Sequence, residues 1–105
     1  ESLFNLVDDV IEGRYPHARQ RLERLLETGL GAGQLFGMLG RQFKMMIAGK
    51  DLVAHRATRE ELFAGVGTRS DFALRKALAQ SERFRMEELI ALSGGALSLT
   101  SFQAG

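Results

Sequence analysis

The sequence contains no cysteine, so it can form neither a disulfide nor a metal site with thiolate ligands. Its longest apolar runs are far shorter than the ~20 residues that a membrane-spanning helix needs, and no signal-peptide pattern opens the chain. Charge of one sign is not in excess either, since 14 basic and 13 acidic residues leave a net charge of +1. This balance excludes a broad nucleic-acid-binding surface driven by bulk charge. We expect a soluble cytoplasmic protein without a membrane partner.

Residues that disfavour helices are also scarce. Proline and tyrosine occur once each and β-branched residues are few, whereas Leu, Ala, Arg and Glu dominate the composition. A chain of 105 residues is long enough for one domain with its own core. We therefore predict a single all-α domain over residues 1–105, a compact bundle of about five to six helices. Because the first residue is Glu1 and not Met, we expect a processed chain or a fragment of a longer one.

The most apolar stretch runs from Leu35 to Ile47, and we predict that it lies in a central helix from about Gly33 to about His55. At about 100° per residue, its polar side is one narrow strip that includes Gly37, Arg41 and Lys44. Nearly every other direction around this helix is apolar. We therefore expect the helix to be packed on several sides.

Two features of this central helix need an explanation. Gly37 and Gly40 each cost a helix roughly 1 kcal/mol relative to alanine, so we expect another helix backbone to lie close to them. The residues Met38, Met45 and Met46 could form a promiscuous binding groove, but core packing is the more usual role of such methionines.

Start and stop signals place the other helices. The residues Thr58 and Glu61 form a capping box, and either Ser70 or Thr68 can cap the helix that follows. The segment 29–33 has three glycines in five residues but lacks the Lys-Ser/Thr pair of a phosphate-binding loop, so we expect a turn between helices. The predicted helices besides the central one are residues 2–12, Pro16 to Gly29, a short one after Thr58, Asp71 to about Phe84, and Met86 onward.

Charged residues gather in three places. For each we favour a solvated surface over a binding role. The alternative for Asp8, Asp9 and Glu12 is a docking face for a basic partner, and the alternative for Arg14, Arg19, Arg21 and Arg24 is a phosphate clamp. The alternative for the third group is a DNA-binding patch of Arg69, Arg75, Lys76, Arg83 and Arg85.

The C-terminal stretch has the opposite character. After Glu88 the chain has 17 residues and no charged side chain. Such a segment is unusual on a free surface, so we expect it to be buried, either within this domain or against another.

Catalytic chemistry is not indicated. The only histidines are His17 and His55, and the spacing assigns neither of them a catalytic or metal-ligating partner. No dinucleotide fingerprint, metal motif or nucleophile elbow occurs. We expect no catalytic residue, no cofactor and no metal in this chain, and therefore no enzyme.

Three features follow one another along the chain: the opening Leu3–Gly13, the helix that ends at Gly29, and the run Leu39–Lys44. Their order resembles the C-terminal domain of the bacterial DNA polymerase III delta subunit, in which a Leu-x-Arg-Gln-Phe-Arg signature is similar to Leu39–Lys44. Phe84, followed by a final helix, also fits. The family often has serine after this phenylalanine as a helix cap, whereas this chain has Arg85.

This resemblance implies a helical collar domain at the C-terminus of a clamp-loader subunit, with other clamp-loader subunits as partners through collar contacts. It is also compatible with a minor contact to primer–template DNA. A stand-alone helical interaction module and a small helical DNA-binding domain stay open as alternatives. The residues that we predict to contact a partner or DNA are Arg41, Gln42, Lys44, Arg75 and Lys76. We expect the guanidinium of Arg41 to reach a carboxylate, a helix C-terminus or a partner.

Overall fold

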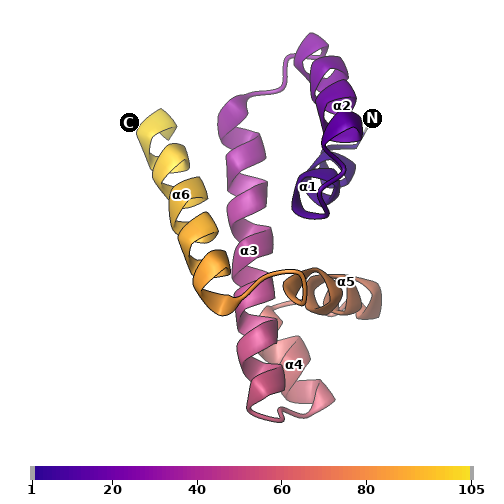
Figure 1. Cartoon of the computed structure of the whole chain (residues 1–105), viewed down its shortest axis with the longest axis vertical. Coiled ribbons are helices and arrows are strands. Elements are labelled where there is room, and N and C mark those ends of the chain that lie inside the picture. The colour runs from indigo at the N-terminus through magenta and orange to yellow at the C-terminus, as the bar shows by residue number, and fades with distance from the viewer. Residues whose placement is uncertain (1, 105) are drawn as a thin grey trace.

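The helix α3 (Ala32–Ala54) runs through the middle of the molecule, and the other helices pack around it (Figure 1). A computed structural model describes residues 2–104, with side-chain burial for residues 2–95. Over these residues the fold has six helices and no strand. The all-α bundle predicted from composition and periodicity is confirmed, and so is the central helix, to within one residue at each end. Besides α3, the helices are α1 (Leu3–Ile11), α2 (Tyr15–Glu27), α4 (Arg59–Val66), α5 (Asp71–Ser81) and α6 (Met86–Ala104).

The helices lie on different sides of α3. Figure 1 shows α6 along one side, with α1, α2 and α5 on the other side. The helix α4 packs against the C-terminal end of α3. This arrangement follows from the wide apolar arc of α3, which offers packing surface in several directions.

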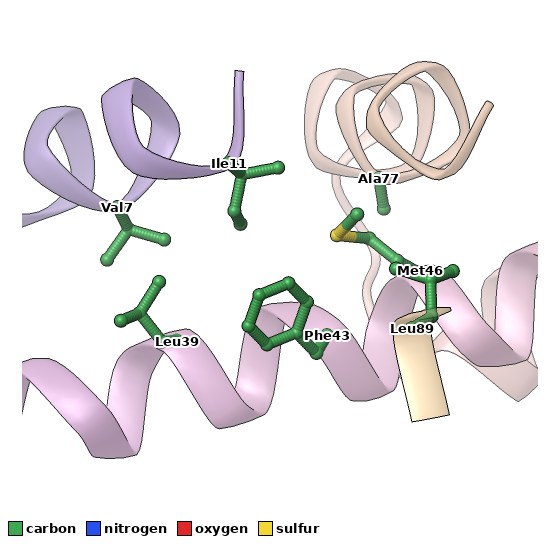
Figure 2. Close-up of a cluster of buried hydrophobic side chains, with 7 residues drawn as sticks. All are labelled: Val7, Ile11, Leu39, Phe43, Met46, Ala77 and Leu89. Carbon is green, nitrogen blue, oxygen red and sulfur yellow. The ribbon is translucent and has the colours of Figure 1, made fainter. Parts of the chain in front are cut away.

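The main core lies where α1, α5 and α6 meet α3. Figure 2 shows Val7 of α1 near Leu39 of α3, Ile11 of α1 near Phe43 of α3, and Ala77 of α5 next to Met46. Met46 has no exposed surface, which confirms core packing for this methionine. Met38 and Met45 are only half-buried and pack at the edge of the cluster.

A second, smaller core joins α1 to α2. It is built on Leu6 from α1 and on Ala18 and Leu25 from α2, all of them buried. The two helices are connected by Gly13, whose φ of +79° is a left-handed conformation that favours glycine. Gly29 ends α2 in the same way with a φ of +88°, so the glycine-rich segment is the expected turn between helices.

Of the two glycines of α3 expected to lie close to another helix backbone, Gly40 stays a prediction, and Gly37 has open space. A Cβ atom added at Gly37 would meet nothing within 4 Å, so the expectation for this residue is wrong. A Cβ atom at Gly49 would lie 2.8 Å from Cδ2 of Leu78, and one at Gly65 would collide with Leu52. The helices α3, α4 and α5 therefore approach closely at Gly49 and Gly65.

The caps of α4 and α5 are confirmed. Ser70 caps α5, because its hydroxyl oxygen accepts a hydrogen bond from the backbone N–H of Ala73 at 3.1 Å. Thr68 accepts from the N–H of Ser70 instead. Ser2 occupies the N-cap position of α1, but its side chain makes no capping bond.

The capping box of α4 is complete. The hydroxyl of Thr58 accepts from the N–H of Glu61 at 3.2 Å, and the Glu61 carboxylate accepts from the N–H of Thr58 at 3.0 Å. Thr58→Ala removes the first bond and should lower the free energy of unfolding by about 1 kcal/mol. Thermal denaturation measures this loss, and Thr58→Ser, which keeps the hydroxyl, is the control. Equal melting of the two variants would contradict the role of the cap.

The helix α5 ends earlier than predicted. It stops at Ser81 and not near Phe84, and a turn follows in which the N–H of Phe84 donates to the carbonyl of Ser81. The backbone N–H of Arg85 then donates to the carboxylate of Glu88 at 2.9 Å. This bond is one half of a capping box. Glu88 thus stabilises the start of α6 although no serine or threonine precedes the helix.

Candidate functional site

The acidic residues of α1 face inward, toward other helices. Asp9 is 2% exposed, and its two carboxylate oxygens accept from Nε of Arg14 at 2.9 Å and from Nε of Arg21 at 2.8 Å. The solvated acidic face expected from the sequence is therefore wrong, and so is the purely solvated role of these two arginines. The partner of this carboxylate lies within the chain, in α2 and the turn before it.

The arginines keep Asp9 ionised. Burial raises the pKa of Asp9, but the hydrogen bonds and positive charges of Arg21 and Arg14 outweigh burial and leave this pKa below its ordinary value. Arg14 also donates to Glu12 at 2.8 Å, and these carboxylates raise the pKa of Arg14. The cluster stabilises the packing of α2 on α1.

A second polar network joins α1, α3 and α5 through Gln80. The amide nitrogen of Gln80 donates to Asp8 at 2.9 Å and to Glu12 at 2.8 Å. Its carbonyl oxygen accepts from Gln42 at 2.9 Å. The Lys76 ammonium lies 3.2 Å from the Asp8 carboxylate. Sequence reasoning missed Gln80, whose only signal is a polar residue at a position on the inner side of its helix.

The five predicted contact residues have three different environments. The network just described brings Gln42 and Lys76 together, so both make contacts within the chain. Arg75 is exposed and pairs with Asp71 of its own helix at 2.8 Å. Arg41 and Lys44 are exposed on α3. Neither of these two cations has a hydrogen bond or ion pair with any residue that the structure describes.

The basic region of the C-terminal half is largely balanced by carboxylates. Arg75 and Arg59 share Asp71, whose pKa their hydrogen bonds and charges lower. Lys76 pairs with Asp8, and Arg85 lies 3.4 Å from Glu88. This pairing favours the solvated-surface interpretation over a DNA-binding patch.

A groove lies between α1, α3 and α5 next to the polar network. Met38 and Met45 from α3 and Val7 from α1 give it apolar walls. Phe4 and Arg41 also line it, and its volume is about 150 Å³. The two half-buried methionines thus lie at a surface, as the groove interpretation of the sequence requires, while Met46 lies in the core.

The helix α6 packs on α3 with one side and exposes the other. Leu89 and Ser93 are buried, whereas Ile90 and Leu92 are 57% and 43% exposed. Ala91, Gly94 and Gly95 are exposed as well. Burial of this uncharged stretch within the domain is therefore wrong for these residues, and burial against another protein stays a prediction. The side chains of residues 96–105 lie outside the described part.

Potential metal ligands do not cluster in the described part of the chain. Within residues 2–104, no cluster of three or more His, Asp or Glu side chains could hold a metal ion. His55 lies 3.4 Å from Asp51 one turn earlier in α3, both side chains being exposed. No helix described is long and apolar enough to cross a membrane.

One family model matches most of the chain. The family model described as DNA polymerase III delta subunit, C-terminal domain, matches residues 1–99. Searches of curated proteins and of solved structures give no significant match. The match spans all of α1 to α5 and most of α6. The chain therefore belongs to the family formed by the C-terminal domains of DNA polymerase III delta subunits.

Proposed function

We propose that this domain is a collar element, which holds its parent clamp-loader protein in the ring by binding the collar domains of neighbouring subunits. Family membership supports this role, because a delta subunit works with other clamp-loader components. In this proposal the domain is a structural scaffold. It neither hydrolyses ATP nor opens the clamp.

The exposed apolar residues of α6, which flank its buried side, are the observation that carries the proposal. Ile90 and Leu92 lie on a helix whose described side chains after Glu88 include no charge. Exposed apolar surface of this kind is characteristic of protein–protein interfaces, whose centres are depleted of charged residues. Gly94 and Gly95 have open space around them, so another helix could approach this side of α6 closely.

The polar networks support the same proposal indirectly. They neutralise Asp8, Asp9 and Lys76 within the domain, so these groups contribute little to binding a charged partner. After Glu88, the exposed side chains that the structure describes on α6 are Ile90, Ala91 and Leu92, all of them apolar. Binding by burial of apolar area is therefore better supported than binding to DNA phosphates.

The double variant Ile90→Asp/Leu92→Asp tests the proposal. Both residues are exposed, so the melting temperature of the isolated domain should change little. Binding to the other clamp-loader subunits should weaken about 30-fold or more, since hot-spot residues contribute at least ~2 kcal/mol. Size-exclusion chromatography of the mixed subunits, followed by titration calorimetry, measures the loss.

The matched control is Val53→Asp, a charge placed at a residue of α3 that is 54% exposed and far along the sequence from α6. This variant should assemble like the parent chain. Undiminished co-elution of the double variant would refute the α6 interface. Failure of the parent chain to bind any clamp-loader subunit would refute the collar function itself.

A further inference from the structure

The groove between α1, α3 and α5 has the size of one aromatic side chain. Its volume is about 150 Å³, and an apolar cavity of ~150 Å³ in a protein is known to admit a benzene ring. Met38 and Met45 form flexible walls that can adapt to such a ring. Phe4 stands at the edge with 66% of its surface exposed, where a bound ring could stack against it.

Most of the polar groups that line the groove already have partners within the chain. Asp8 and Lys76 both line it, but they pair with each other at 3.2 Å. Gln80 donates a further hydrogen bond to Asp8 and accepts one from Gln42, which also lines the groove. The lining groups Asp8, Lys76 and Gln42 are therefore occupied by contacts within the chain.

Arg41 differs from the other polar residues of the groove. Its side chain is exposed at the groove, and it makes no hydrogen bond or ion pair within the described part of the chain. The carboxylate or helix C-terminus expected from the sequence is thus not its partner there. A guanidinium presents its donors as a planar fork, which matches the two oxygens of a carboxylate.

We propose that this groove binds a short acidic segment of a partner protein, with one aromatic side chain between the methionines and a neighbouring carboxylate on Arg41. Figure 1 shows α1 and α5 on the side of α3 away from α6, so this surface is distinct from the proposed collar interface. One chain can therefore bind an acidic segment and a neighbouring subunit at the same time.

Charge complementarity favours an acidic peptide over a nucleic acid. The groove contains one cation without a partner, Arg41, because Asp8 and Lys76 pair with each other. A strand of nucleic acid needs several cations along its backbone. A short acidic peptide with one aromatic side chain needs only a single cation next to an apolar groove, and Arg41 beside Met38 and Met45 provides both.

The four methionines provide direct reporters of binding. In the whole chain labelled with ¹³C at the methionine methyl groups, Met38 and Met45 report on the groove. Met46 in the core and Met86 on α6 serve as internal controls. The probe is the capped peptide Gly-Asp-Phe-Asp-Gly. Two reference peptides replace either its phenylalanine by alanine or both of its aspartates by lysine.

The Asp-Phe-Asp peptide should shift the methyl signals of Met38 and Met45 in a saturable way and leave Met86 unchanged. Both reference peptides should bind more weakly. Arg41→Gln should weaken binding of the probe by up to about fivefold, the upper end of the range for a solvent-exposed ion pair. Lys44→Gln, which removes an exposed cation of the same helix, should leave the affinity unchanged.

Other outcomes would overturn the proposal. Equal binding of the acidic and lysine peptides would exclude selection of a carboxylate by Arg41. Absence of any shift at Met38 and Met45 up to millimolar peptide would exclude the groove as an aromatic site. Because binding is measured on the isolated chain, neither result depends on clamp-loader assembly. The collar function could therefore fail while the groove proposal holds, and the reverse is equally measurable.

Discussion

Replacing Asp9 by asparagine should lower the free energy of unfolding by about 2 kcal/mol. The carboxylate is buried and accepts charge-assisted bonds from Arg14 and Arg21, and hydrogen bonds to charged groups contribute about 1.5–3 kcal/mol. The loss stays below the 3–5 kcal/mol of a fully buried broken pair because both arginines reach solvent and remain hydrated. Urea denaturation of the two chains measures the difference.

The control for Asp9→Asn is Glu23→Gln. Glu23 pairs with Arg19 at 3.4 Å, and both side chains are largely exposed. Removal of this pair should change the free energy of unfolding by less than about 0.5 kcal/mol. If the two variants lost the same stability, burial of Asp9 would not be what makes its ion pairs valuable.

The same residue sets a pH dependence. The pKa of Asp9 is lowered in the folded state, and so is that of Glu12, through its hydrogen bonds with Arg14 and Gln80. A lowered pKa stabilises the fold at pH values above the ordinary values, 3.8 for Asp9 and 4.5 for Glu12. This stability is lost as the pH falls through the depressed values. The slope of stability against pH in this acid range should therefore be shallower in Asp9→Asn.

The burial of Asp9 shows where helical periodicity stops being informative. The buried apolar residues Leu6, Val7 and Ile11 define the inner side of α1. Asp9 lies beside this stripe, which is why periodicity predicts a solvated position for it. Whether such a flanking residue is exposed depends on where the next helix packs. Here α2 covers that flank and supplies Arg21, and the sequence of α1 alone contains no sign of it.

Local signals, in contrast, are sufficient for most of the fold. The capping box at Thr58, the Ser70 cap and the glycine stops depend on a few neighbouring residues, so the sequence shows them directly. The close approaches at Gly49 and Gly65 depend on side chains far away in the sequence, Leu78 and Leu52, and are not predictable from local pattern.

For the two candidate surfaces, composition is visible in the sequence, but exposure and neighbours depend on the packing of the helices. The uncharged character of α6 is visible in the sequence, whereas its exposure follows from packing on α3 with one side only. For Arg41, the sequence predicts an unusual cation on an apolar helix. Its position beside a groove depends on α1 and α5, which approach α3 from two other places in the chain.

Replacing Leu89 by alanine should destabilise the domain by about 3 kcal/mol, within the 2–5 kcal/mol found for such core truncations. Leu89 has no exposed surface and packs in the main core, where it joins the start of α6 to α3 (Figure 2). Its loss weakens the attachment of α6, so amide hydrogen exchange in this helix should accelerate more than in α2. Denaturation and exchange measured on the same sample check both effects.

The neighbouring Ile90 is the matched control for this variant, because it is the next residue of the same helix but is 57% exposed. Ile90→Ala should leave the free energy of unfolding within about 0.5 kcal/mol of the parent chain. If α6 is the collar interface, this variant should nevertheless weaken subunit binding, whereas Leu89→Ala weakens binding only through loss of the docked helix. Equal destabilisation by the two variants would mean that α6 does not pack on α3 through the side that contains Leu89.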